Sequence, residues 1–160
     1  MLTCFFENKG KALLRHVTVN AIVIKNNQIL LGKRGLFNGK PIPEFGKWGL
    51  LGGYLDRDEN LTQAVKREVM EESGWGVDGI EFFRINDNPN RPMEDKQNVD
   101  MIFIAKATKQ VKNSDEEVSK LQWFDLDNLP PKEEIAFDHG DSIALYKKYL
   151  AKKFNLPALG

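Results

Sequence analysis

Hydrophobic and polar positions alternate, or β-branched residues cluster, along five segments of the chain, and such patterns predict β-strands. The predicted strands are His16–Lys25, Gln28–Lys33, Gly79–Ile85, Val99–Thr108 and Lys120–Phe124. Asn26 and Asn27 separate the first two strands, and asparagine is a common residue in tight hairpin turns. The first two strands are therefore expected to form an antiparallel hairpin.

Apolar residues recur at helical spacing in the middle of the chain, and this predicts an α-helix. The apolar positions of this helix are Leu61, Ala64, Val65 and Val69. Asn60 is a suitable N-cap, with Gln63 three residues later as its capping-box partner. Gly74 stands where a left-handed C-cap belongs. The sequence thus predicts a helix from about residue 61 to residue 73.

A second amphipathic helix is predicted near the end of the sequence, with Asp141 as its cap. Its apolar face is formed by Ile143, Tyr146, Tyr149 and Leu150. Lysines occupy the opposite face. Strands mixed with two helices predict an α/β fold, in which residues 1–160 form one layered domain.

Three segments between or after these elements are expected to lack regular structure. Gly35–Lys47 is rich in Gly and Pro, and loops of this length are often functional. Asn86–Asn98 is a second polar, proline-containing loop. Residues 155–160 are expected to fray.

Composition and charge narrow the class of protein. Hydrophobic residues make up 41% and charged residues 29% of the chain, which indicates a globular protein rather than a disordered or membrane protein. Lys and Arg (23) balance Asp and Glu (23), which argues against nucleic acid as a sequence-nonspecific partner. Cys4 is the single cysteine, so no internal disulfide is expected. With no signal peptide and no membrane span in the sequence, we expect a cytoplasmic protein.

The end of the first helix carries an unusual concentration of carboxylates. Glu68 and Glu72 project along the same line as the apolar residues, and Glu71 lies roughly 60° to one side. Like charges at this spacing repel, and the helix dipole disfavours anions at a C-terminus. A divalent cation would relieve both costs, because Mg²⁺ binds carboxylate oxygens. The alternative is an acidic helix end that is simply solvated.

The same stretch resembles the signature of the Nudix hydrolase family. Gly53, Glu59 and the run Arg67–Trp75 (REVMEESGW) match the pattern G-x5-E-x7-R-E-U-x-E-E-x-G-U, where U is a bulky apolar residue. Two departures are Trp75, at a position that is usually aliphatic, and Leu51, where many relatives have proline. The resemblance implies an α/β/α sandwich with a mixed β-sheet. It also implies hydrolysis of a pyrophosphate bond with Mg²⁺ or Mn²⁺.

The resemblance also implies roles for individual residues. Glu68, Glu71 and Glu72 are expected to be metal ligands, together with the carbonyl of Gly52. Glu68 is our first choice for the base that activates water, and Glu71 and Arg67 are further catalytic candidates. Structural support is expected from Glu59, paired with Arg67, and from Gly53. A further carboxylate is expected from a downstream loop, for which the candidates are Glu116, Glu117, Glu94 and Asp95.

The sequence says less about the substrate. Candidate contacts in the predicted loops are Arg34, Phe37, Phe45, Trp48 and Arg91, each of which could equally be a surface or packing residue. The loop before Val99 resembles that of family members acting on ADP-ribose or nucleotide sugars, so this small-molecule nucleotide class is favoured. The alternatives are a nucleoside triphosphate pyrophosphohydrolase and a nucleotide-sensing domain without turnover. Leu2–Phe6 is apolar and could form a homodimer interface.

Overall fold

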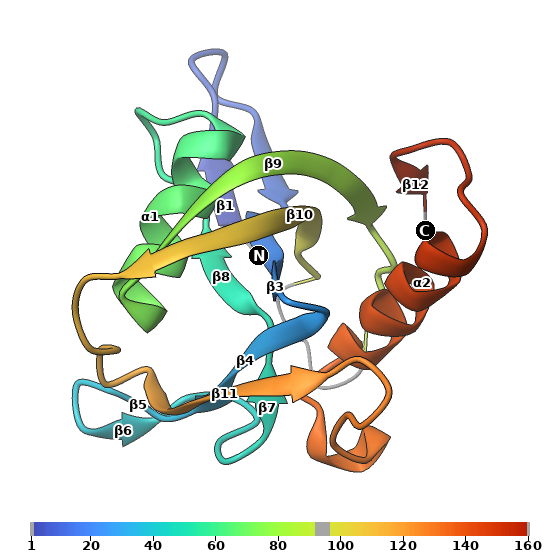
Figure 1. Ribbon diagram of the computed structural model, residues 1–160. Helices are drawn as coiled ribbons and strands as arrows, with labels where there is room; N and C mark the ends of the chain where they lie inside the picture. Colours follow the sequence, from blue (N-terminus) through green and yellow to red (C-terminus); the bar gives the residue numbers. More distant parts are fainter. Residues whose placement is uncertain (1, 92–96, 160) are drawn as a thin grey trace.

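The structure, a computed structural model, describes residues 2–91 and 97–159, and within them an eight-stranded mixed sheet forms the centre of the fold (Figure 1). Its main strand order is β11-β4-β3-β10-β9-β12, with β7 paired to β4 and β8 paired to β3. The strands are β3 (Val17–Lys25), β4 (Gln28–Arg34), β7 (Trp48–Gly49), β8 (Leu51–Tyr54), β9 (Trp75–Asn86), β10 (Val99–Gln110), β11 (Val118–Asp125) and β12 (Ala158–Leu159). β3 and β10 run parallel and the β3–β4 pair is antiparallel, so the sheet is mixed.

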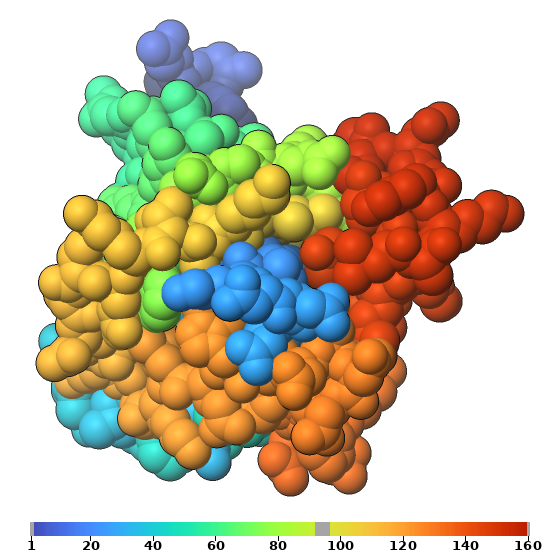
Figure 2. Space-filling model, in the orientation of Figure 1, coloured from blue at the N-terminus to red at the C-terminus, as the bar shows by residue number. Residues whose placement is uncertain are grey.

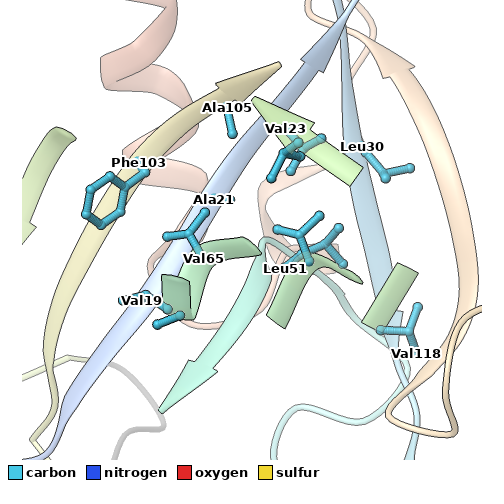
Figure 3. Packing of buried hydrophobic residues seen from close by; sticks show 12 residues of the cluster. Val19, Ala21, Val23, Leu30, Leu51, Val65, Phe103, Ala105 and Val118 are labelled. Carbon is cyan, nitrogen blue, oxygen red and sulfur yellow. The ribbon is translucent and has the colours of Figure 1, made fainter. Parts of the chain in front are cut away.

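Each face of the sheet is covered by one helix, α1 (Leu61–Ser73) or α2 (His139–Ala151). Alternate residues of β3 point to opposite faces, because side chains along a strand alternate. Val19 and its i+2 neighbours belong to the cluster that packs on α1, whereas Ile22 belongs to the cluster that packs on α2. Figure 3 shows Val65 of α1 among the side chains of β3 and β8. The predicted α/β/α sandwich is therefore confirmed.

The β3–β4 hairpin forms as predicted. Asn26 and Asn27 have positive φ angles of 49° and 63°, the conformation that a type I′ turn requires at both central positions. The turn sets the register in which Val23 faces Leu30. β4 then ends at Arg34, directly before the segment Gly35–Lys47.

Helix α1 begins and ends at the predicted caps. The Asn60 side chain accepts a hydrogen bond from the Gln63 backbone N–H at 3.0 Å, and the Gln63 side chain accepts one from the Asn60 N–H at 2.8 Å. Gly74 adopts φ = 69° and donates its N–H to the Met70 carbonyl at 2.9 Å. These local contacts fix where the carboxylate-bearing end of the helix lies.

Replacing Asn60 with alanine is expected to lower the free energy of unfolding by about 1 kcal/mol, because the Gln63 N–H loses its acceptor. Urea denaturation would measure the loss. Thr62→Ala, an exposed change inside the same helix, is the control and should leave stability within about 0.5 kcal/mol. Equal losses in both variants would contradict a capping role.

Two predictions about elements and their boundaries are wrong. The segment Gly35–Lys47 contains a small hairpin of β5 (Leu36–Phe37) and β6 (Lys40–Pro41). Helix α2 begins at His139, before the predicted cap Asp141, which instead accepts a hydrogen bond from Lys132 Nζ at 2.8 Å. A 3₁₀ turn (Lys132–Glu134) precedes it.

The final segment is also ordered where fraying was expected. β12 pairs in parallel with β9, with Ala158 opposite Arg84, so it covers the edge of the sheet. Leu150, predicted to lie on the buried face of α2, is 43% exposed, whereas Ile143 and Tyr146 are buried as predicted. After α2 the chain turns back and pairs with β9, so the residues beyond the helix contact the edge of the sheet and do not extend α2.

The first segment forms a separate two-stranded hairpin, β1 (Leu2–Phe5) and β2 (Lys11–Leu14). In Figure 2 it projects, in dark blue, beyond the body of the molecule. Phe5 is 76% exposed and Leu13 62% exposed. The expected homodimer interface at this segment stays a prediction. Helices of the described segments all fall short of the length and apolar character needed to cross a membrane.

Candidate active site

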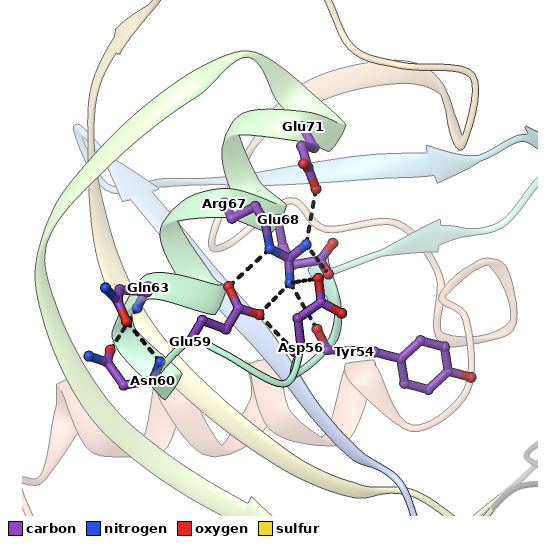
Figure 4. Close-up of polar contacts among 8 residues, drawn as sticks. All are labelled: Tyr54, Asp56, Glu59, Asn60, Gln63, Arg67, Glu68 and Glu71. Carbon is purple, nitrogen blue, oxygen red and sulfur yellow. Dashed lines mark hydrogen bonds and ion pairs between the residues drawn. The ribbon is translucent and has the colours of Figure 1, made fainter.

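Arg67 is the centre of the polar contacts between α1 and the loop that precedes it (Figure 4). Its guanidinium donates to both carboxylate oxygens of Glu59, at 3.0 Å and 2.6 Å, so the predicted pair is present. It also donates to Glu68 Oε1 at 2.8 Å, to Glu71 Oε2 at 3.0 Å and to the Tyr54 carbonyl at 3.0 Å. The hydrogen bond from Arg67 lowers the pKa of Glu59. Arg67 therefore holds the loop before α1 against the helix and keeps Glu59 ionised.

Glu68 lies against the two glycines inside β8. A Cβ atom on Gly53 would fall 2.6 Å from Glu68 Oε1, so a larger residue there would displace this carboxylate from its present position. Burial raises the pKa of Glu68, and the charge of Arg67 partly offsets that rise. Glu68 is thus held in a position where it can accept a proton.

Glu72 is the most deeply buried of the three carboxylates, with an exposed fraction of 8%. Its Oε2 accepts a hydrogen bond from the Gly52 N–H at 2.7 Å. Burial raises its pKa well above the ordinary value, and the Gly52 N–H offsets this only in part. Gly52 itself has φ = 152°, and a Cβ there would lie 2.0 Å from the Val19 carbonyl oxygen. Glycine is therefore required at this position.

The sequence predicted three glutamates gathered around an ion, and the structure arranges them differently. Glu71 is half exposed and turns toward Arg67. In residues 2–91 and 97–159, no three acidic, histidine or cysteine side chains come together closely enough to hold a metal as they stand. Arg67 offsets the repulsion between Glu68 and Glu71, whereas the charge of Glu68 still raises the pKa of Glu72.

A cavity of about 490 Å³ opens beside Glu68 and Glu72. Eight of the predicted residues line it, namely Glu68, Glu72, Gly52, Gly53, Arg34, Phe37, Arg91 and Glu117. Burial raises the pKa of Glu117, and the nearby carboxylate of Asp115 adds to the rise. Glu117 is thus the downstream carboxylate that faces the site.

Other candidates lie outside the cavity. Trp48 is 7% exposed and packs edge-on against Phe124 in the core. The Glu116 side chain accepts a hydrogen bond from the Asn38 N–H at 2.7 Å, which holds the β5–β6 hairpin. Phe45 is 55% exposed and is not a lining residue. Glu94 and Asp95 lie outside the described residues.

Arg34 shapes one half of the cavity. Its Nε donates to the Pro43 carbonyl at 2.6 Å, and its guanidinium lies 5.0 Å from the centre of the Phe137 ring. Ile42, Pro43, Phe37 and Phe137 give this half an apolar lining. A cation beside an apolar wall suits a ligand with both phosphate and aromatic parts.

Arg91 lies in the other half, where its charge is already matched. Its guanidinium binds Asp138, with Nη2 at 2.7 Å from Oδ1, and reaches Asp100 at 3.5 Å. The side chain of Arg91 is only 3% exposed. Arg91 is therefore an anchor between β10 and the start of α2, and the predicted phosphate or ribose contact is not the role that these bonds indicate. Its bond to Asp138 also explains why that carboxylate makes no cap for α2.

Sequence reasoning missed several lining residues, among them Thr18, Asn20, Phe137 and His139. The first two carried a signal, because polar residues interrupt an otherwise apolar strand at alternate positions. His139 is isolated in the sequence and carried no such signal. Its Nδ1 accepts the Leu50 N–H at 3.0 Å, and burial, helped by the charges of Arg91 and Arg34, lowers its pKa to about 3.

The site can be compared with those of known proteins. An ADP-ribose pyrophosphatase of Methanocaldococcus jannaschii is 30% identical over 133 residues, which cover 83% of this chain and 73% of the relative. NAD-capped RNA hydrolase NudC of Vibrio cholerae is 33% identical over 110 residues, covering 68% of this chain but only 37% of that protein.

Solved structures give the same result for the fold. A NUDIX hydrolase from Nitrosomonas europaea superimposes with a TM-score of 0.79 at 26% identity, over 95% of this chain and 81% of that one. The NUDIX domain of Shewanella oneidensis NrtR, solved with ADP-ribose, gives 0.70 at 26% identity, over 91% and 94% of the two chains. The family model described as NUDIX domain matches residues 14–146, which include every element of the site from β3 to the start of α2. The chain belongs to the Nudix hydrolase family.

Proposed function

We propose that this protein hydrolyses the pyrophosphate bond of a nucleoside diphosphate linked to a second group, with ADP-ribose or a nucleotide sugar as the favoured substrate. The observation that carries the proposal is the placement of Glu68 and Glu72 beside Gly52 and Gly53 of β8, at the wall of a cavity of about 490 Å³. A cavity of this size accommodates a nucleotide-sized ligand. The similarity to an ADP-ribose pyrophosphatase supports the choice of substrate class.

The residues present fit a divalent cation of the kind that this family requires, Mg²⁺ or Mn²⁺. Hard cations prefer oxygen donors, and Glu68, Glu72, Glu71 and the Gly52 carbonyl would supply them. Burial raises the pKa of Glu72 because it destabilises the ionised carboxylate. A bound cation would remove this cost, since the cation stabilises the ionised form. When bound, the cation would neutralise charge on the diphosphate and acidify the attacking water.

The protein's own groups supply positioning and proton transfer. Arg67 holds Glu68 on one side and Gly53 of β8 leaves space for its carboxylate on the other, so Glu68 is our candidate for the base that takes the proton of the attacking water. Glu71, which Arg67 also holds, is the second candidate. Arg34 would bind a phosphate oxygen of the substrate. Phosphoryl transfer depends mainly on such positioning and charge stabilisation.

A panel assay tests the reaction class. The wild-type protein with Mg²⁺ or Mn²⁺ is expected to cleave ADP-ribose or a nucleotide sugar, with a nucleoside monophosphate identified by chromatography. Glu68→Gln should lower kcat by about 10²-fold or more, because the amide cannot accept the proton. Glu133→Gln, an exposed change on the 3₁₀ turn, is the control and should keep full activity. Absence of cleavage of every ADP-ribose, nucleotide-sugar, triphosphate and dinucleotide substrate would refute the proposal.

A nucleotide-binding domain without turnover is the second candidate. The observation that favours it is the similarity to the NrtR domain, which was solved with ADP-ribose. Each glutamate of the motif is present in this chain, and this favours turnover over sensing. In the panel assay, tight binding of ADP-ribose by calorimetry without any product would select the sensing role. Preferred cleavage of nucleoside triphosphates would select the pyrophosphohydrolase alternative.

A further inference from the structure

Two polar side chains of β3, Thr18 and Asn20, line the cavity and are held in orientation by a buried carboxylate behind them. Asp100 Oδ1 accepts hydrogen bonds from Asn20 Nδ2 at 2.8 Å and from Thr18 Oγ1 at 3.2 Å. Because the amide nitrogen of Asn20 is committed to Asp100, its Oδ1 turns the other way. That oxygen lies beside the Gly52 backbone, where a Cβ would approach it to 2.9 Å. Thr18 and Asn20 therefore present hydrogen-bond acceptors to the cavity.

His139 adds a donor elsewhere in the lining of the same cavity, where its ring centre lies 5.5 Å from that of Phe137. Its Nδ1 accepts the Leu50 N–H, so this nitrogen carries a lone pair, and the neutral ring must then hold its proton on Nε2. Across the two segments that the structure describes, Nε2 forms no hydrogen bond with the protein. The ring lines the cavity. The Nε2–H is consequently available to a ligand.

The cation behind Thr18 and Asn20, Arg91, is already matched by carboxylates. Arg91 is bound by Asp138 and Asp100, and all three are buried. Phosphate oxygens are acceptors only, so they would meet the oxygens of Asn20 and Thr18 without any uncompensated cation. A hydroxyl group suits the same surface, because it donates to one side chain and accepts from another.

Two parts of the cavity lining therefore differ in chemistry. The part around Arg34 has an apolar wall with Phe37 and Phe137, which suits a nucleobase and an adjacent phosphate. We propose that Thr18 and Asn20 form a subsite for the hydroxyl-bearing group joined to the distal phosphate, such as a sugar, while the nucleobase lies against the apolar wall around Arg34. The assignment rests on the proposed function for the identity of the ligand, and it predicts that hydroxyl groups of the distal moiety determine specificity.

A matched pair of ligands isolates these hydroxyl groups. ADP esterified with glycerol and ADP esterified with propanol share the nucleotide and the three-carbon chain, and only the first carries free hydroxyls. Calorimetry in EDTA measures binding without turnover. The wild-type protein is expected to bind the glyceryl ligand about tenfold more tightly than the propyl ligand, as two neutral hydrogen bonds would provide.

Two variants connect the preference to the subsite. Thr18→Val removes the hydroxyl at nearly constant volume and should reduce the preference about threefold, whereas Thr18→Ser should keep it. Asn20→Leu should reduce the preference further, provided that circular dichroism shows it to be folded. Thr3→Val, the same chemical change on the exposed β1 strand, is the control and should bind as the wild type does.

Each outcome supports or overturns the assignment. Equal affinity of the two ligands for the wild-type protein, or an unchanged preference in both Thr18→Val and Asn20→Leu, would overturn it. A third outcome is that the two ADP esters bind equally, while Thr18→Val changes the relative affinity of ligands with adenine and with hypoxanthine. In that case the subsite binds the base and the assignment is wrong. A hydroxyl preference in EDTA combined with no hydrolysis in Mg²⁺ would refute the proposed function but leave the subsite supported.

Discussion

Replacing Glu72 with glutamine is expected to reduce kcat/KM by at least about 10²-fold while leaving the fold intact. Glutamine has nearly the same shape, and its Oε1 can accept the hydrogen bond from the Gly52 N–H that Glu72 accepts now. What it removes is the negative charge, which the site needs to bind a divalent cation next to the diphosphate. Steady-state assays with Mg²⁺ and the best substrate of the panel measure the loss. Activity within twofold of the wild type would exclude Glu72 from the metal site.

The same substitution is expected to stabilise the metal-free protein at alkaline pH. Burial raises the folded-state pKa of Glu72 above its ordinary value of 4.5, so the folded protein holds this proton more tightly than the unfolded chain does. The corresponding stabilisation is complete below pH 4.5 and is lost as the pH rises through the folded-state pKa. Glutamine has no such dependence. In EDTA, the melting temperature of Glu72→Gln relative to the wild type should therefore increase between about pH 5 and pH 8, and a constant difference would contradict this account.

Replacing Arg91 with methionine is expected to destabilise the protein by about 3–5 kcal/mol, because it leaves two buried carboxylates without their cation. Asp100 is fully buried, and its pKa is raised to about 6 even with Arg91 present, with burial as the main cause. Without Arg91, both carboxylates cost more when ionised. The loss should therefore be larger at pH 8 than at pH 5, where protonation relieves it. Chemical denaturation at the two pH values measures both effects.

Arg57→Met is the matched control for this prediction. The Arg57 side chain is 93% exposed, and its contact with Asp58 is 3.6 Å long and equally exposed. Exposed ion pairs of this kind contribute little, so the control should lie within about 0.5 kcal/mol of the wild type at either pH. If Arg91→Met were as mild as the control, the buried network would not be holding β10 against α2.

Contacts that are local in sequence were the ones that could be predicted. The caps of α1 involve residues three or four positions apart, and the β3–β4 turn depends on two adjacent asparagines, so short patterns contain the information. Arg67 and Glu71 are also four residues apart, and this pairing could have been anticipated. It offsets the repulsion between Glu68 and Glu71, but not the repulsion between Glu68 and Glu72.

Contacts between distant segments could not be predicted in this way. Arg91 meets Asp138 across 47 positions, and Asn20 meets Asp100 across 80. No periodicity links such pairs, because they depend on the parallel pairing of β3 with β10 and on where α2 is placed. The boundary of α2 was wrong for the same reason, since Asp138 is engaged by Arg91 and Asp141 by Lys132. The candidate polar subsite is built entirely from pairs of this type.

The hydrogen bonds between Asp100 and the two cavity residues on β3 have a consequence for how specificity can diverge in evolution. Any exchange at Thr18 or Asn20 must also satisfy a buried carboxylate, so most single substitutions there would reduce fitness through stability before they could create a new preference. Phe37 and Ile42 have no comparable obligation. New substrate ranges are therefore expected to arise first through substitutions in and next to the β5–β6 hairpin, whereas Thr18 and Asn20 are expected to change slowly.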